Sequence, residues 1–259
     1  MESKVIVITG ASAGIGAALA ERLGREGHCL ALAARRKPEL EAVAARCGKA
    51  LVAPTDVCRR SEVEALLDAA LKAFGRVDVW VNNAGQGINR SVQELSDQDF
   101  DFIMAVNVKS ALYGMQTVIP HFKRRNGGHL INVASFLGRV PVVPFRSAYN
   151  AAKAALIALT ANLRMELALS HPGIHVSVVL PGAVSTGFAR NALGGLPQGG
   201  WPASSVPIQT PEAVADLMAG LIAAPAAELY THPGQQAAAV KYAQDVAGFE
   251  AERRRGVRA

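Results

Sequence analysis

The sequence predicts an α/β fold in which helices cover a parallel β-sheet. Short β-branched stretches alternate with longer helical ones along the 259 residues. Half of the residues are apolar and only 5% are aromatic, which is typical of Val-rich buried strands under Ala-rich helices. A glycine-rich turn joins the first strand to the first helix. Because no internal repeat and no linker interrupts the alternation, we expect one domain spanning residues 1–259.

The turn after the first strand favours nucleotide binding. Residues 5–8 form a β-branched run, and the chain is helical from the turn to Glu26. Between them Gly10, Gly14 and Gly16 follow a G-x-x-x-G-x-G spacing, which differs from the more common G-x-G-x-x-G. Such glycines let backbone N–H groups and a helix N-terminus approach a phosphate that Cβ atoms would block. We therefore prefer a bound nucleotide to a plain tight turn.

The second strand, expected over 28–34, ends at two arginines. An NAD-selective site usually places an acid here, where it accepts a hydrogen bond from the ribose 2′-hydroxyl. Arg35 and Arg36 stand there instead, and guanidinium groups suit the 2′-phosphate of NADP. The alternative is that both are solvated at the start of the helix expected over 38–47. We expect NADP(H) to be preferred, with NAD(H) as the alternative.

Polar residues also follow the third and fourth strands, expected over 51–53 and 77–81. Asp56 either accepts a hydrogen bond from an adenine amino group or caps the next helix. A capping box over 61–64 begins that helix, which is expected to reach Phe74. After the fourth strand, Asn82-Asn83-Ala84-Gly85 fits either the ligand crevice at the carboxyl end of a parallel sheet or a simple turn.

The next two elements bring further polar side chains. A helical region expected from Ser96 to His121 contains Asn107 between two valines, where it either faces inward as a hydrogen-bonding post or points to water. The fifth strand, expected over 129–134, delivers Ser135 at its carboxyl end. A loop with two prolines then leads into a helix expected from about residue 148 to 170.

On that helix Tyr149 and Lys153 lie one turn apart and project from one face. Lowering a phenol from its reference pKa of about 10 to roughly 7 requires about 4 kcal/mol in favour of the phenolate. A cation at about 5 Å contributes roughly 3 kcal/mol at an effective dielectric constant of about 20. The pair predicts proton exchange between Tyr149 and a substrate oxygen to which Ser135 donates a hydrogen bond. The alternative is two ordinary residues on a surface helix.

The last part of the chain contains an unusually long loop. The sixth strand, expected over 174–180, ends at Pro181-Gly182, and a helix opened by Thr210 and a last strand over 228–232 follow later. Between them, residues 187–209 are rich in glycine and proline and carry four apolar residues: Phe188, Leu193, Leu196 and Trp201. A loop of this length is typically a lid or binding loop, and we expect it to close over an apolar substrate. Permanent packing on the core or on a partner subunit is the alternative.

Composition argues against several other classes of protein. The net charge is +6, but basic residues are scattered except in short runs such as Arg253 to Arg255, and no aromatic-basic interleaving indicates a nucleic-acid partner. No signal-peptide pattern and no apolar stretch approaching 18 residues is present, so we expect a cytoplasmic protein without a membrane partner. Three cysteines form no metal-ligand spacing and are expected to be reduced, and no metal site is predicted.

In order and spacing, these motifs resemble those of the short-chain dehydrogenase/reductase family. The similarity covers roughly residues 4 to 224. The residues that carry it are Thr9-Gly10-x-x-x-Gly14-Ile15-Gly16, Asn82-Asn83-Ala84-Gly85, Asn107, Ser135, Tyr149-x-x-x-Lys153 and Pro181-Gly182. The resemblance implies a single-domain, Rossmann-like, doubly wound sheet of about seven parallel strands flanked by helices. It also implies an NADP(H)-dependent oxidoreductase that transfers hydride between nicotinamide and a carbonyl or secondary alcohol.

The resemblance further implies a role for each matching residue. Tyr149 would be the acid/base, and Lys153 would lower its pKa and hold the nicotinamide ribose. Ser135 would polarise the substrate and Asn107 would anchor a proton relay. Asp56 and Val57 would bind adenine, and Thr186 would contact the nicotinamide carboxamide. The positions expected to contact the cofactor are Gly10, Ser12, Ala13, Gly14, Ile15, Gly16, Arg35, Arg36, Asp56, Val57, Asn83, Ala84, Gly85, Tyr149, Lys153, Pro181, Gly182, Val184 and Thr186.

Two departures from the family pattern and two alternatives complete the prediction. Ala134 stands before Ser135 where a second serine is frequent, and the divergent tail over 233–259 lacks the usual glycine-rich closing strand. Small residues after Lys153 suggest close helix pairing in at least a homodimer. An NAD-linked alcohol dehydrogenase is the alternative enzyme. A non-catalytic NADP(H)-binding regulator is the alternative class, although it would not need Tyr149 and Lys153 together.

Overall fold

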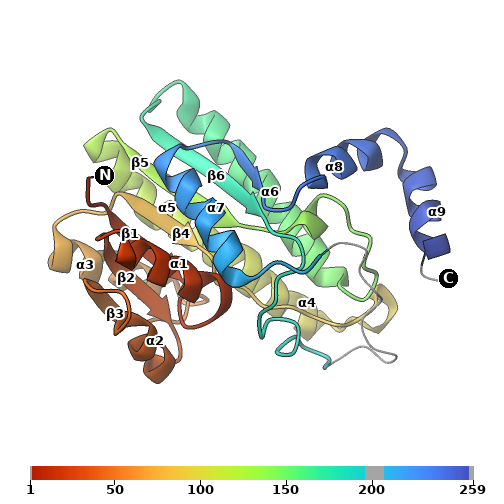
Figure 1. Ribbon diagram of the computed structural model, residues 1–259, viewed down its shortest axis with the longest axis horizontal. Coiled ribbons are helices and arrows are strands. Elements are labelled where there is room, and N and C mark those ends of the chain that lie inside the picture. The colour runs from red at the N-terminus through yellow and green to blue at the C-terminus, as the bar shows by residue number, and fades with distance from the viewer. Residues whose placement is uncertain (1, 196–206, 257–259) are drawn as a thin grey trace.

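The computed structural model describes residues 2–195 and 207–256. Within them, parallel strands form a seven-stranded sheet in the order β3-β2-β1-β4-β5-β6-β7, which confirms the predicted fold class (Figure 1). The strands are β1 (Val5–Thr9), β2 (Cys29–Ala34), β3 (Ala50–Pro54), β4 (Val79–Asn82), β5 (Gly128–Val133), β6 (Ile174–Leu180) and β7 (Glu228–Tyr230). Their order reverses between β1 and β4, and a crevice for ligands opens at the carboxyl ends of strands at such a reversal.

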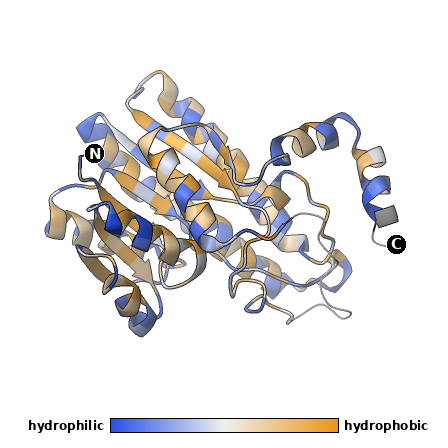
Figure 2. Cartoon of the chain, viewed as in Figure 1, coloured by the Kyte–Doolittle hydropathy of each residue, from blue (hydrophilic) through white to orange (hydrophobic). Residues whose placement is uncertain are grey.

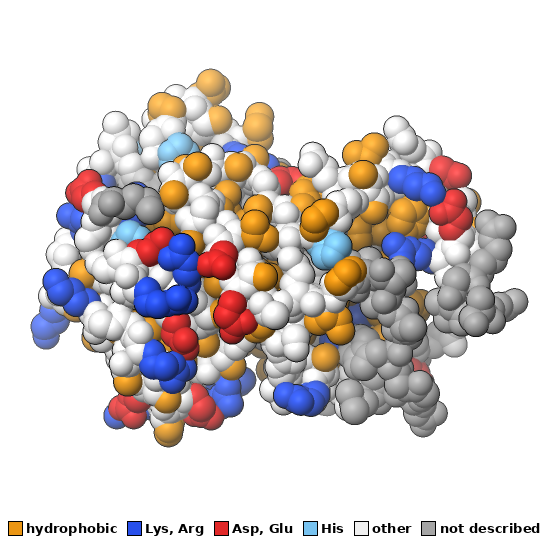
Figure 3. Space-filling model, viewed as in Figure 1, with side chains coloured by type: hydrophobic (Ala, Val, Ile, Leu, Met, Phe, Trp, Pro, Cys, Tyr) orange, Lys and Arg blue, Asp and Glu red, His pale blue; other side chains and the backbone are white. Residues whose placement is uncertain are grey.

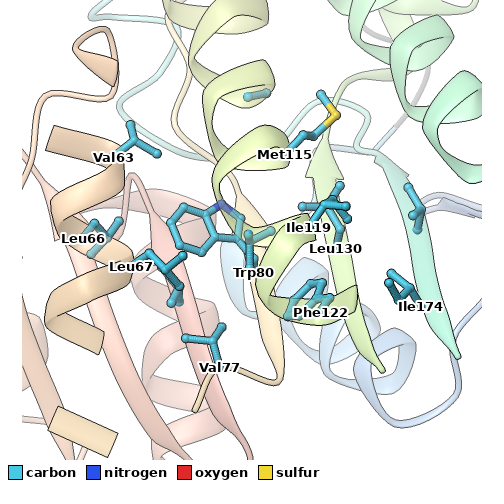
Figure 4. Packing of buried hydrophobic residues seen from close by; sticks show 14 of the residues in the cluster. Val63, Leu66, Leu67, Val77, Trp80, Met115, Ile119, Phe122, Leu130 and Ile174 are labelled. Carbon is cyan, nitrogen blue, oxygen red and sulfur yellow. The ribbon is translucent and has the colours of Figure 1, made fainter. Parts of the chain in front are cut away.

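Helices cover both faces of the sheet. Buried apolar side chains of α1 (Gly14–Arg25), α2 (Lys37–Ala44) and α7 (Pro211–Ala223) pack on one face. Those of α3 (Arg60–Phe74), α5 (Ser110–Arg125) and α6 (Ser147–Ala168) pack on the other. Figure 4 shows Trp80 of β4 at the centre of this second layer, between the leucines of α3 and Phe122 of α5. The strands are apolar on both sides, as a sheet covered by helices requires (Figure 2).

The long helix expected from Ser96 to His121 is interrupted. Ser96 caps α4 (Asp97–Met104) by accepting a hydrogen bond from the backbone N–H of Asp99, as the sequence indicates. A π-helical segment, η2 (Ala105–Lys109), then separates α4 from α5. Single π-helical turns often occur at functional sites because the extra residue redirects a side chain. Here the segment contains Asn107, which is buried, so the inward-facing interpretation of this residue is confirmed.

The start of α3 differs from the prediction. The helix begins at Arg60 after an Arg59 cap that makes no side-chain hydrogen bond, so the capping box expected over 61–64 is wrong. Glu62 instead accepts a hydrogen bond from the backbone N–H of Asp56, which ties the helix to the preceding loop. A complete capping box is formed at another place, where Ser91 and Glu94 enclose the short helix η1 (Val92–Glu94). Both sequences satisfy the same pattern, and only tertiary contacts separate them.

The segment after β6 is partly packed on the core. The isolated bridge between Ile88 and Leu193 holds its first part, and Phe188 and Leu193 contact a buried cluster that includes Tyr149. These two side chains are therefore half-buried, whereas the lid interpretation treats them as exposed. Leu196 and Trp201 lie outside the described residues. The short helix η3 (Phe136–Gly138) borders the same region from the end of β5.

The chain ends in two mostly hydrophilic helices, α8 (Gln235–Gln244) and α9 (Val246–Gly256), at the end of the molecule far from β3 (Figures 1 and 2). Among the described residues, no helix has the length and apolarity needed to cross a membrane. Figure 3 shows acidic and basic side chains interspersed over α1 and α7, where Arg22 pairs with both Glu26 and Asp216. This face therefore carries no large region of a single charge.

Candidate active site

Tyr149, Lys153 and Ser135 meet at the carboxyl end of the sheet. Tyr149 and Lys153 project from the first turns of α6, and Ser135 directly follows β5. All three are buried, with exposed fractions of 9%, 3% and 6%. The Lys153 Nζ lies 5.6 Å from the centre of the Tyr149 ring and donates a 2.9 Å hydrogen bond to the Val133 carbonyl oxygen. The structure thus places a phenol, an ammonium group and a hydroxyl within one small volume.

Burial shifts the acidity of both ionisable groups at this site. Burial raises the pKa of Tyr149, while the hydrogen bond with Ser135 and the positive charge of Arg146 act to lower it. Burial also lowers the pKa of Lys153 to about 7. Both shifts have the same cause, because a charge in an apolar surrounding loses its hydration.

Asn107 holds the loop that follows β4. Its side-chain amide donates to the carbonyl oxygens of Gln86 and Ile103, and its Oδ1 accepts from the backbone N–H of Gln86. A Cβ atom on Gly85 would lie 3.0 Å from Asn107 Oδ1 and 3.5 Å from Lys153 Nζ. The absence of a side chain at Gly85 thus lets the loop pass between Asn107 and Lys153. The structure brings Asn107 to the site as a support of the loop.

The glycine-rich turn forms the opposite wall of the site. Gly10 and Gly14 have φ values of 66° and 57°, in the left-handed region that favours glycine. A Cβ atom on Gly16 would lie 2.4 Å from the Gly10 carbonyl oxygen and 2.5 Å from Asn83 Nδ2. The side-chain amide of Asn83 binds to the turn by donating hydrogen bonds to the carbonyl oxygens of Thr9 and Gly10. The three glycines of this turn leave the backbone at the start of α1 open, which suits the binding of a dinucleotide phosphate.

The other predicted cofactor positions are arranged around that turn. Ser12, Ala13 and Ile15 belong to the turn and the first turn of α1, and a Cβ atom on Gly14 would lie 3.1 Å from the Thr186 methyl carbon. Thr186 therefore brings the segment after β6 against the turn. Ala84 donates its backbone N–H to Thr9 Oγ1, which joins the ends of β4 and β1. The other cofactor positions predicted after β6 lie in the same segment as Thr186: Pro181, Gly182 and Val184.

The two arginines after β2 are exposed beside the same turn. The Arg36 guanidinium lies 3.4 Å from Ser12 Oγ through Nη2 and 3.0 Å from Glu39 through Nη1. Burial raises the pKa of the Cys58 thiol in the loop after β3. The positive charge of Arg35 acts to lower this pKa, so Arg35 lies within electrostatic reach of that loop. In that loop Asp56 Oδ1 accepts from the backbone N–H of Cys58 and makes a local turn. Asp56 therefore does not cap α3, whose cap residue is Arg59.

Arg146 and Phe188 also belong to the site, and the sequence analysis did not single out Arg146. Arg146 is 5% exposed and precedes Tyr149 on the approach to α6. Its guanidinium carbon lies 6.0 Å from the centre of the Tyr149 ring and 5.8 Å from that of Phe188. The two rings are 5.5 Å apart. Arg146 lies just outside the helix, so no local pattern in the sequence indicates its place beside Tyr149.

Comparisons with known proteins identify the family of this chain. A family model described as short chain dehydrogenase matches residues 4–194. An uncharacterized oxidoreductase of Staphylococcus saprophyticus is 39% identical over 188 residues, which are 72% of this chain and 76% of that protein. One from Staphylococcus aureus strain MW2 is 37% identical over 188 residues, with 72% of this chain and 80% of that protein covered.

Solved structures show the same likeness over nearly the whole chain. A short-chain dehydrogenase/reductase from Burkholderia phymatum in complex with NAD is 29% identical, with a TM-score of 0.85 and coverage of 95% of this chain and 94% of that chain. An alcohol dehydrogenase from the archaeon Thermococcus sibiricus, complexed with 5-hydroxy-NADP, is 30% identical, with a TM-score of 0.76 and coverage of 88% and 96%. With the family model matching most of its length, the chain belongs to the short-chain dehydrogenase/reductase family of oxidoreductases.

Proposed function

We propose that the protein is an NADP(H)-dependent oxidoreductase that interconverts a carbonyl group and a secondary alcohol, with Tyr149 as the acid/base. The observation that carries this proposal is the burial of Tyr149, Lys153 and Ser135 together at the carboxyl end of the sheet, where the glycine-rich turn at Gly10 to Gly16 also follows a strand. When bound, the nicotinamide cofactor supplies or accepts the hydride. The chain supplies orientation and the proton.

The side chains of this site suit proton transfer to a substrate oxygen. In the reductive direction Ser135 Oγ donates a hydrogen bond to the carbonyl oxygen, and the Tyr149 hydroxyl gives its proton to that oxygen as hydride reaches the carbon. Lys153 compensates the phenolate that Tyr149 becomes. In the oxidative direction the phenolate takes the alcohol proton back. Asn107 keeps the loop after β4 in place through its hydrogen bonds to Gln86.

The preference for NADP(H) rests on the charges beside the turn. Arg35 and Arg36 follow β2 without an acid between them, and Arg36 reaches Ser12 within the turn. A guanidinium at this place meets the 2′-phosphate that distinguishes NADP from NAD. The remaining contacts are those that the family implies: Asp56 and Val57 would bind adenine, Asn83 to Gly85 would line the cofactor, and Thr186 would contact the carboxamide. We propose that the whole chain acts as one catalytic domain.

Two finer proposals concern the substrate and the assembly. Phe188 lies against Tyr149 in a cluster with Ile88 and Leu193, so the walls next to the reacting oxygen are apolar and suit a substrate with hydrocarbon or ring substituents. On the outer side of α6 the small residues Ala151, Ala154 and Ala158 are exposed. Small residues permit close helix approach, and they favour a homodimer through this face.

The test is a panel of ketones and secondary alcohols followed by nicotinamide absorbance with each cofactor. We expect turnover with NADPH on apolar ketones and none in the Tyr149→Phe variant. Cofactor binding without turnover on any compound would favour the alternative of a nucleotide-binding regulator. Equal turnover by the parent and Tyr149→Phe would refute the mechanism.

A further inference from the structure

We propose that Arg146 is a second fixed positive charge that acts through Tyr149 and stabilises its phenolate. The inference rests on the proposed acid/base role of Tyr149 and adds to it a positioning residue outside the matched motifs. Arg146 immediately precedes α6, three residues before Tyr149. It is 5% exposed, and its guanidinium carbon lies 6.0 Å from the centre of the Tyr149 ring.

Three segments from distant parts of the chain hold the guanidinium in this place. A Cβ atom on Gly87 would lie 2.4 Å from Arg146 Nη1, so the glycine leaves the room that the side chain fills. The Phe188 ring covers the guanidinium at 5.8 Å. The backbone of Arg146 is fixed by a bridge to Arg90 and by the hydrogen bond from Asn150 N–H to its carbonyl oxygen. Because the guanidinium is held by packing and shielded from water, it keeps its position, and its electrostatic effect on Tyr149 is little screened.

The charge of Lys153 alone is a weak support for the phenolate near neutral pH. Burial lowers the pKa of Lys153 to about 7, so deprotonation of the ammonium competes with deprotonation of the phenol. A guanidinium keeps its proton in proteins, although burial lowers the pKa of Arg146 as well. A unit charge at about 6 Å and an effective dielectric constant of about 20 shifts a neighbouring acid by roughly two pH units. Arg146 therefore adds a positive charge that can lower the pKa of the Tyr149 phenol, and this charge stays present when Lys153 loses its proton.

The other charged side chains near α6 are directed elsewhere. On α4 and η2, Asp97, Asp101 and Lys109 are exposed, and Asp99 lies 3.9 Å from Arg90. Near η3 and β7, Arg139 pairs with Glu228. Arg190, which follows Phe188 in the chain, and His175 on β6 are exposed. Within the described part of the chain, Arg146 and Lys153 are thus the two cations directed at the phenol.

Two other roles for Arg146 give different results in the same experiment. A clamp for Phe188 requires the shape of the side chain, and a binding group for an anionic substrate requires the guanidinium to contact the substrate. A charge that acts on Tyr149 requires only a cation at this place. Arg146→Met removes the charge and keeps the length, whereas Phe188→Leu loosens the packing on the guanidinium and keeps the charge. Arg90→Met is the matched control, because Arg90 is the bridge partner of Arg146 and its side chain faces Asp99.

The experiment is an absorbance titration of tyrosinate in the full-length protein between about pH 7 and 12.5, without cofactor and with NADP⁺. The chain has four tyrosines, so the signal of Tyr149 is the difference between each protein and the same protein carrying Tyr149→Phe. We expect the Tyr149 midpoint to rise by about one to two pH units in Arg146→Met, and by less than about 0.3 in Phe188→Leu and Arg90→Met. Circular dichroism checks that each variant is folded.

An unchanged Tyr149 midpoint in Arg146→Met would overturn the proposal, and so would an equal rise in Phe188→Leu, which would indicate packing in place of charge. A second readout is the pH dependence of kcat/KM for alcohol oxidation, whose acidic limb should move with the absorbance midpoint. The titration needs no substrate. A protein that shows the predicted midpoints and no turnover would therefore refute the oxidoreductase mechanism while leaving the electrostatic role of Arg146 intact.

Discussion

Replacing Arg36 by alanine should selectively weaken the binding of NADPH. The guanidinium lies 3.4 Å from Ser12 Oγ, beside the turn that fits the phosphates, and 3.0 Å from Glu39. A charge-assisted hydrogen bond contributes about 1.5 to 3 kcal/mol. Because the Arg36 side chain is 56% exposed, we take the lower end of that range after screening by solvent. The dissociation constant for NADPH should rise about tenfold, and that for NADH should stay unchanged.

The neighbouring acid gives an opposite variant. Glu39 competes with a phosphate for Arg36 and repels it, and this exposed ion pair contributes roughly 0.2 to 1 kcal/mol. Glu39→Gln should therefore tighten NADPH binding by about two- to fivefold. Arg46→Ala is the matched control for the loss of one positive charge. Its side chain is 55% exposed and pairs with Glu21, away from the turn, in the same way that Arg36 pairs with Glu39.

The assay is isothermal titration calorimetry with NADPH and NADH at one fixed salt concentration, because exposed charges are screened by salt. The Arg35→Ala, Arg36→Ala double variant should lose more NADPH affinity than Arg36→Ala alone. Equal affinity of the parent protein for the two cofactors would refute the reasoning. A loss of NADPH affinity in Arg46→Ala as large as in Arg36→Ala would also refute it, since the effect would then be one of net charge.

Four further predictions test the proton carrier, the substrate wall, acid stability and assembly. Tyr149→Phe should lower turnover by about 10² to 10⁴ in a nicotinamide absorbance assay while NADPH affinity is kept, and near-parent turnover would contradict its role. Phe188→Ala should raise KM about tenfold for bulky apolar ketones and little for small polar ones, because burying an aromatic ring contributes more than about 1.5 kcal/mol; a uniform loss would count against an apolar wall. Burial lowers the pKa of His129 to about 3. Below about pH 6.5 the unfolded chain therefore binds a proton at His129 that the folded chain does not bind, and the free energy of unfolding decreases as the pH falls. Between pH 7 and about 5 the loss from His129 should approach about 2 kcal/mol in urea unfolding. In His129→Leu the loss should be smaller by that amount, with a remainder from His28 and His121, whose pKa values burial also lowers; an undiminished loss in that variant would exclude His129 as the cause. Light scattering at micromolar concentration should show a dimer, and a monomer would contradict the proposed α6 interface.

The parts of the fold that the sequence predicts well are those in which local pattern and burial agree. The sixth strand, expected over 174–180, is β6 (Ile174–Leu180), because its apolar run is bounded by residues that cannot continue a strand. Thr210 caps α7 by accepting a hydrogen bond from the backbone N–H of Ala213, as the Thr-Pro-Glu pattern indicates. In both places the signal lies within a few residues of the feature it predicts, so no distant contact is needed to interpret it.

Prediction was less successful where a residue has a distant partner. The π-helical turn at Asn107 has the composition of an ordinary helix. Its side chain makes two hydrogen bonds with the backbone of Gln86, which lies in a distant part of the chain. The hydrogen bonds of Asn83 to the carbonyl oxygens of Thr9 and Gly10 were likewise not visible in the sequence, and its expected place beside the cofactor stays a prediction. The choice between lid and packed loop also depends on distant contacts, since Leu193 is held by Ile88. Period and propensity carry no information about such partners.

Arg146 shows the same limit at the residue that we propose to tune the site. An arginine just before a helix usually extends into water, and the sequence around it, Phe145-Arg146-Ser147, contains no sign of burial. The burial comes from Gly87, which leaves space for the guanidinium, and from Phe188, which covers it. These three residues lie in three separate segments, yet each is needed before the charge can be held 6.0 Å from the Tyr149 ring. The proposed catalytic pair of Tyr149 and Lys153 is visible in sequence because one helix contains both residues, whereas the electrostatic surrounding that sets their acidity is a property of the folded chain.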